Sequence, residues 1–165
     1  MTVKIALYKG TRAGLPGLYN YAVRAWTIGP YSHCELIAEE HVDGSTTCWG
    51  ASWPDGGVRR KTMHLDPDKW DVIEVAGHLA SAISWFEAHE GDGYDVRGNF
   101  GLILRPLGHS QHKWFCSEAI LAALGFVEPW RYCPNSMSAI FSSTCIKPLA
   151  DEAFVFRVAY TTKIN

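Results

Sequence analysis

The sequence lacks several features by which a protein is commonly assigned to a class. Its 165 residues hold 15 basic and 17 acidic side chains, a formal charge of −2, with no cluster of five basic residues. Nucleic-acid-binding proteins need a basic surface, so we expect no nucleic-acid partner. No run of roughly 18 apolar residues is present, so we expect no membrane span. Residues 1–9 are too short and too charged for a signal peptide, which predicts a soluble, cytoplasmic protein.

Cysteine is present, but the spacing that a disulfide framework or a four-cysteine zinc site requires is missing. The number of cysteines is odd, and no two of them form a CxxC pair. We therefore expect most of them to be small buried side chains in a reducing compartment. The five cysteines are Cys34, Cys48, Cys116, Cys133 and Cys145.

The sequence does contain enough apolar material for a core, since 47% of its residues are hydrophobic and 13% are aromatic. A typical domain has roughly 100–200 residues, so we expect a single domain over residues 1–165. Short alternating segments, separated by turn residues, predict strands in the first half of the chain. The predicted strands are 3–8, 34–39, 46–52, 58–65 and 70–75.

In the second half of the chain, the apolar period changes to that of helices. The predicted helices are 78–90, 115–124 and 136–141, with a shorter helical piece at 98–104 and a closing strand at 154–160. Before them, residues 10–20 are predicted to form a loop and residues 21–28 a short helix. Strands followed by helices indicate an α+β fold in which an antiparallel sheet packs against helices.

Cys116 differs from the other cysteines because it stands at the start of a predicted helix. The free N–H groups and the dipole of a helix N-terminus stabilise a thiolate, which is the nucleophilic form of cysteine. Such a nucleophile needs a histidine as base and a third group that orients the histidine. All seven histidines precede Cys116, and His33 is the best candidate, at the mouth of a predicted strand. Glu35 shares its strand face, whereas Cys34 points to the other face and is expected to pack in the core.

A metal site is a weaker interpretation of the same region. His109, His112 and Cys116 have the spacing i, i+3, i+7, which would place them on one helix face. Pro106 and Gly108 argue against a helix through His109, and zinc would need a further ligand. We therefore expect no metal and no other cofactor.

Four segments together are similar to a known family. They are Ser32-His33-x-Glu35-Leu36, Ala51-Ser52 followed by Asp55-Gly56-Gly57-Val58, Tyr94-Asp95, and Phe115-Cys116-Ser117-Glu118. Over residues 31–124 the chain resembles the circularly permuted NlpC-like papain-fold proteins of the YaeF/YiiX type, including their phage and prophage relatives. In that family a histidine on a strand precedes a cysteine that opens a helix, which is the order found here.

The resemblance implies a permuted papain-like fold and a cysteine hydrolase, an amidase or peptidase and possibly an acyltransferase, that works through a thioester. Carried over by motif, Cys116 is the nucleophile and His33 the base. Many relatives have a Glu-Ala pair on the following strand that completes the triad, but Gly50-Ala51 stands here. The third group is therefore either Glu35, which shares the face of His33, or Ser52.

The expected substrate is a small molecule, a peptide or a cell-wall peptide, bound near the site by Tyr31, Ser52 and Trp114. The backbone N–H of Cys116, helped by the hydroxyl of Tyr31, would stabilise the oxyanion. Asp95 is expected to be structural. Two other hypotheses stay open, a catalytically silent binding or structural module on the same fold and a zinc hydrolase that uses His109 and His112.

Overall fold

The computed structural model describes residues 2–96 and 112–142 of the chain. Within these residues the strands form one curled sheet with the order β5-β1-β2-β3-β4-β6-β7. The neighbours pair antiparallel, except that β6 and β7 run parallel. The strands are β1 (Thr2–Tyr8), β2 (His33–Glu40), β3 (Thr46–Ser52), β4 (Gly57–Met63), β5 (Trp70–Ala76), β6 (Gly93–Tyr94) and β7 (Lys113–Trp114).

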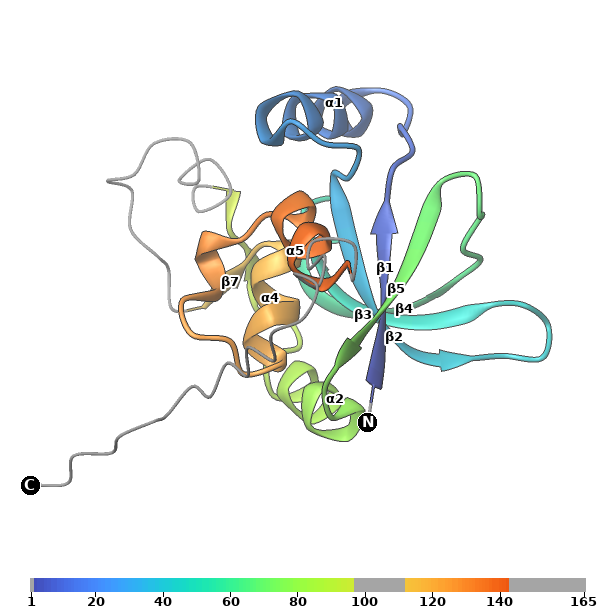
Figure 1. Cartoon of the computed structure of the whole chain (residues 1–165), viewed down its shortest axis with the longest axis vertical. Coiled ribbons are helices and arrows are strands. Elements are labelled where there is room, and N and C mark those ends of the chain that lie inside the picture. Colours follow the sequence, from blue (N-terminus) through green and yellow to red (C-terminus); the bar gives the residue numbers. More distant parts are fainter. Residues whose placement is uncertain (1, 97–111, 143–165) are drawn as a thin grey trace, which may run out of the picture.

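Four α-helices accompany the sheet in the described residues, so the expected α+β class is confirmed. They are α1 (Leu15–Thr27), α2 (Leu79–Ala88), α4 (Cys116–Ala123) and α5 (Pro134–Phe141). Figure 1 shows α2, α4 and α5 on one side of the sheet, and α1 apart from them at the end of the strands. Among the helices of the described residues, none is both long and apolar enough to cross a membrane.

The sheet is apolar on both faces near β2, because neighbouring residues of a strand point to opposite sides. Leu36 belongs to the main core, which also contains Phe86 of α2 and Ile120 of α4. Ile37 belongs to a smaller cluster on the other face, together with Cys48. Burying one such large apolar side chain contributes about 1.5–3 kcal/mol, so α2 and α4 are fixed on the sheet mainly by this core. The beginning of β2 is therefore enclosed from both sides.

The predicted elements differ from the structure mainly around α1. Residues 10–20 are not a loop throughout, because α1 begins at Leu15 rather than at residue 21. Gly14 has a φ of 69°, a conformation that glycine adopts without strain, and Pro16 stands in the first turn, where its missing N–H costs nothing. These two residues start the helix rather than prevent it. The predicted helical piece 98–104, the predicted strand 154–160 and Cys145 lie outside the described residues.

Candidate functional site

The site is built around the start of β2, where His33 is the first residue of the strand. Its ring nitrogen Nε2 lies 2.7 Å from Oε1 of Glu35. The side chains share a strand face, as the spacing predicts, and both are buried, with relative exposures of 8% for His33 and 0% for Glu35. The pair is therefore an enclosed hydrogen-bonded unit rather than an exposed polar strand face.

Arg59 of β4 also binds the carboxylate of Glu35, through both of its oxygens. Its Nη1 donates to Oε2 of Glu35 at 2.7 Å, and its Nη2 donates to Oε1 at 2.5 Å. The Nε of Arg59 also donates to Asp55 at 2.8 Å, which fixes the guanidinium. A two-pronged ion pair of this kind sets both the position and the orientation of the carboxylate. Sequence reasoning missed Arg59.

Gly50 makes the contact between Glu35 and Arg59 possible. β3 runs between β2 and β4, and Gly50 is the β3 residue that pairs with Arg59. A Cβ atom at position 50 would collide with Oε2 of Glu35 and come close to Nη1 of Arg59. The absence of a side chain at this position, which the sequence shows as a departure from a Glu-Ala pair, leaves room for a carboxylate from the neighbouring strand.

The charges of this cluster stabilise one another. Burial alone would raise the pKa of Glu35, but the charge of His33 and the hydrogen bonds from Arg59 and His33 lower it to about 2. Burial alone would lower the pKa of His33, but the charge of Glu35 and hydrogen bonds with Cys116 and Glu35 raise it to about 9. At neutral pH the site therefore holds a carboxylate and an imidazolium.

Cys116 is the first residue of α4, and α4 packs against β2 and β3. Its side chain is 3% exposed. A hydrogen bond from the Cys34 thiol, then a hydrogen bond from the His33 ring and the charge of that ring, hold the pKa of Cys116 well below its usual range. The start of a helix also favours a negative charge. The site thus combines a Cys116 thiolate with a His33 imidazolium.

Cys34 packs in the core and also forms a hydrogen bond with Cys116. It belongs to the main core, as expected from its strand face, and it is fully buried. Burial first, and then its hydrogen bond with Cys116, raise the pKa of its thiol well above the usual range. Cys34 therefore stays protonated, and its S–H group donates a hydrogen bond to the sulfur of Cys116. The alternation of the strand could not predict this contact, because it depends on where α4 begins.

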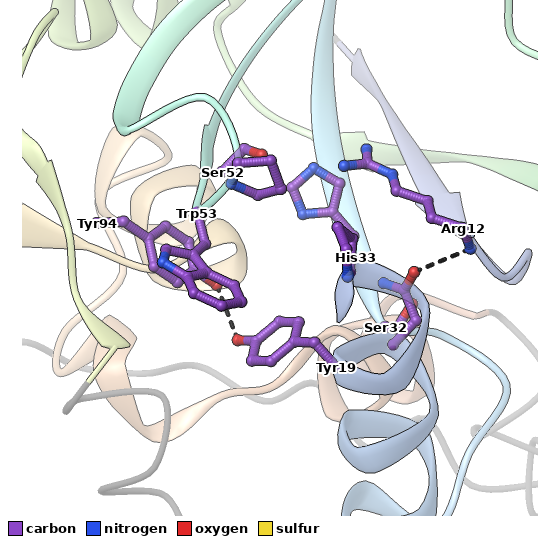
Figure 2. A pocket seen from close by; sticks show the side chains of 10 residues that line it. Arg12, Tyr19, Ser32, His33, Ser52, Trp53 and Tyr94 are labelled. Carbon is purple, nitrogen blue, oxygen red and sulfur yellow. Dashed lines mark hydrogen bonds between the residues drawn. The ribbon is translucent and has the colours of Figure 1, made fainter. Parts of the chain in front are cut away.

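A pocket opens beside His33. It is lined by residues of α1 and the segment before it, by the start of β2, by the end of β3 and the turn after it, and by β6. They include Arg12, Tyr19, Ser52, Trp53 and Tyr94 (Figure 2). The enclosed room is about 20 Å³, enough for roughly one water molecule. The hydroxyl oxygens of Tyr19 and Tyr94 share a hydrogen bond of 3.1 Å. Cys116 is not among the described residues that line the pocket, and His33 is the lining residue that forms a hydrogen bond with Cys116.

Of the residues expected to bind substrate, only Ser52 lines this pocket. The hydroxyl of Tyr31 donates to Oδ2 of Asp71 at 2.8 Å. The indole N–H of Trp114 donates to Oδ2 of Asp92 at 2.9 Å. The structure therefore brings Cys116, His33, Glu35 and Ser52 into one region and places Tyr31 and Trp114 outside the pocket.

The histidines of the zinc hypothesis are not both within the described residues. His112 is 85% exposed, and its Nδ1 lies 3.9 Å from Oδ1 of Asp92, whereas His109 lies outside them. Within residues 2–96 and 112–142, no group of three or more His, Cys, Asp or Glu side chains could hold a metal ion.

Comparison with known proteins gives one informative similarity, and no family model matches the chain. An aminomethyltransferase from Herpetosiphon aurantiacus is 35% identical to the chain over 102 residues. The similar stretch covers 56% of this chain and 28% of that protein. The chain thus spans little more than a quarter of the length of the curated relative that it matches.

This similarity overturns the resemblance to circularly permuted NlpC-like cysteine hydrolases. The prediction of a cysteine peptidase or amidase, with a phage or prophage origin, was wrong, because the similar protein is named for the transfer of an aminomethyl group. The zinc hydrolase fails for the same reason, and the silent module gains no support from a relative that is named as an enzyme. A histidine on a strand and a cysteine on a helix specify an activated thiol, and an activated thiol serves many reactions.

Proposed function

We propose that the chain is a group transferase in which the Cys116 thiolate takes up a small one-carbon group of the aminomethyl type and passes it to an acceptor. The observation that carries this proposal is the thiolate–imidazolium pair of Cys116 and His33, held by Glu35. The name of the similar protein and the small size of the pocket support a small transferred group. Ser52, which lines the pocket, is the proposed contact for a small-molecule substrate.

The reaction has two steps. First, the Cys116 sulfur attacks the methylene carbon of the donor, a C–S bond forms, and the bond from that carbon to the leaving group breaks. The electron pair goes to the leaving group, and the imidazolium of His33 supplies its proton. Second, a nucleophilic acceptor attacks the same carbon, the C–S bond breaks to return the thiolate, and the acceptor gives its proton to His33. No water is consumed, and both partners return to their starting forms.

Glu35 acts by position in this scheme. Its hydrogen bond to Nε2 fixes the plane of the His33 ring, and its charge keeps the ring protonated while the thiolate waits for a donor. A single domain over residues 1–165, the circularly permuted papain-like arrangement and the cytoplasmic location all stay predictions. The order of the chain, with the His33 strand before the Cys116 helix, is compatible with that arrangement.

The proposal is tested with an aminomethyl donor that forms in solution from formaldehyde and ammonium chloride. Peptide mass spectrometry after limited treatment is expected to find the adduct first on Cys116, and to find less of it in His33→Gln. Adding glycine as an amine acceptor is expected to discharge the adduct. Equal labelling of Cys116 and the partly buried Cys133, or an adduct that glycine does not discharge faster than water does, would contradict the proposal.

A further inference from the structure

We propose that the pocket beside His33 binds an anionic group of the substrate, a carboxylate or a phosphate, and that Arg12 is the residue that holds it. This inference rests on the proposed function, because it names the class of substrate that reaches the same site. It would make Arg12 a specificity-determining residue for a reaction whose nucleophile is Cys116.

The position of Arg12 is the first observation. The residue lies between β1 and α1, and its backbone N–H donates to Oδ1 of Asn20 at 3.3 Å, which ties this segment to the helix. Arg12 lines the pocket, and Figure 2 shows its side chain directed toward the ring of His33. An anion bound by the Arg12 guanidinium would therefore also lie in the field of the positive charge of His33.

The charge balance of the pocket is the second observation. None of the described residues that line it is acidic, and no carboxylate of the described residues pairs with Arg12. Arg59, by contrast, pairs with both Glu35 and Asp55. The Arg12 guanidinium makes a cation–π contact with the ring of Tyr8, with its central carbon 5.7 Å from the ring centroid. A guanidinium that is partly buried beside a second cation favours an anion, and its fork-like geometry fits a carboxylate or a phosphate.

The aromatic side chains of the pocket indicate what kind of group is attached to the anion. The rings of Tyr19 and Trp53 are in contact, with centroids 5.7 Å apart and planes tilted by 55°, and Trp53 is 45% exposed. Aromatic rings at the rim give apolar contact area next to the cations. Because the enclosed room holds only about one water molecule, the anionic group lies at the mouth of the pocket and the rest of the molecule along Trp53.

The test compares two alkylating reagents of nearly equal size at constant ionic strength, iodoacetate and iodoacetamide. For each cysteine, the rate with iodoacetate is divided by the rate with iodoacetamide. This ratio is expected to be higher at Cys116 than at Cys133, and Arg12→Gln is expected to lower the Cys116 ratio about tenfold. Arg60→Gln is the matched control, since Arg60 is exposed on β4 and carries the same charge; its ratio should equal that of the wild type. An Arg12→Gln ratio equal to the wild-type ratio would overturn the anion site.

A second measurement does not depend on the thiol. In NMR spectra of the full chain, the side-chain Nε–H signal of Arg12 should shift saturably with sodium acetate or with sodium phosphate, and sodium chloride is the control. The ligand that saturates the shift at the lower concentration shows whether the site prefers a carboxylate or a phosphate. A shift that chloride reproduces would overturn the anion site even if Cys116 is reactive, whereas a saturable shift beside an unreactive Cys116 would contradict the proposed transferase alone.

Discussion

Cys48 in the middle of β3 and Cys116 at the start of α4 are both buried, yet their surroundings give them opposite acid–base properties. Burial first, and then the negative charge of Glu35, raise the pKa of Cys48 to about 12. At Cys116 the hydrogen bonds from Cys34 and His33, together with the charge of His33, lower the pKa. The same carboxylate thus disfavours one thiolate directly and favours the other through the imidazolium that it stabilises. Burial by itself makes a thiol inert, and a donor beside it makes a thiol reactive.

The largest effect is expected from Glu35→Ala, which removes the carboxylate that acts on both thiols. Arg59 would be left buried and without its principal partner, so we expect the free energy of unfolding to fall by about 3–5 kcal/mol, measured by urea denaturation. Glu40→Ala is the control, because its ion pair with Lys4 is exposed to solvent and contributes little to stability. Equal losses in both variants would contradict a central role for Glu35.

Acid is expected to weaken the same cluster without a mutation. The folded pKa of Glu35 is about 2, below the ordinary value of 4.5. The stabilisation is therefore complete above about pH 4.5 and is lost as the pH falls toward 2, and the difference corresponds to about 3 kcal/mol. Urea denaturation at a series of pH values should show this loss in the wild type. Glu35→Gln should lack that part of the pH dependence, and an identical slope in the two proteins would contradict it.

The sequence predicts one half of this charged cluster well. The alternation of a strand has a period of two, so His33 and Glu35 had to share a face wherever the strand lay in the sheet. The contact of Glu35 with Arg59 depends on the pairing of three strands, and no local pattern contains that pairing. The proline and glycines of residues 10–20 are typical of a loop, but proline in a first turn is also typical of a helix start, as Pro16 is in α1.

The class of reaction is harder to predict from the sequence than the residues of the site are. The order of His33 before Cys116 indicated an activated thiol, but the same geometry serves transfer to water and transfer to another acceptor. The difference lies in which molecule reaches the carbon after it is bound to sulfur. The pocket is lined by the residues that would select this molecule. Two of them, Arg12 and Tyr19, belong to residues 10–20, a segment that carries no functional sequence pattern.

An intermediate effect is expected from Gly50→Ala, which displaces the side chain of Glu35 without removing its charge. The added methyl group collides with the carboxylate, so we expect a loss of about 1–3 kcal/mol in unfolding free energy and a higher pKa for Cys116. Gly93→Ala is the matched control, since a Cβ there would make ordinary contact with Lys113. A Gly50→Ala protein as stable and as reactive as Gly93→Ala would show that the space beside Glu35 is not required.

The smallest effect is expected from Cys34→Ala, which removes one of the two donors to the Cys116 sulfur. Losing a hydrogen bond of about 1 kcal/mol should raise the pKa of Cys116 and lower the thiolate population several-fold at pH values below that pKa. Cys34→Ser keeps a donor and should retain more of the reactivity. The measurement is alkylation of Cys116 followed by peptide mapping, and equal reactivity of the alanine and serine variants would exclude a donor role for Cys34.

The ionisation of Cys116 is tested most directly by the pH dependence of its alkylation with iodoacetamide, with Cys133 in the same protein as the reference. The shape of the profile matters more than the absolute rate, because the Cys116 side chain is only 3% exposed. An ordinary thiol is less than about 1% ionised near pH 6. If His33 and Cys34 hold Cys116 as a thiolate, its rate near pH 6 is close to its rate near pH 8, and His33→Gln abolishes this plateau. A Cys116 rate that rises with pH in parallel with that of Cys133 would contradict the thiolate.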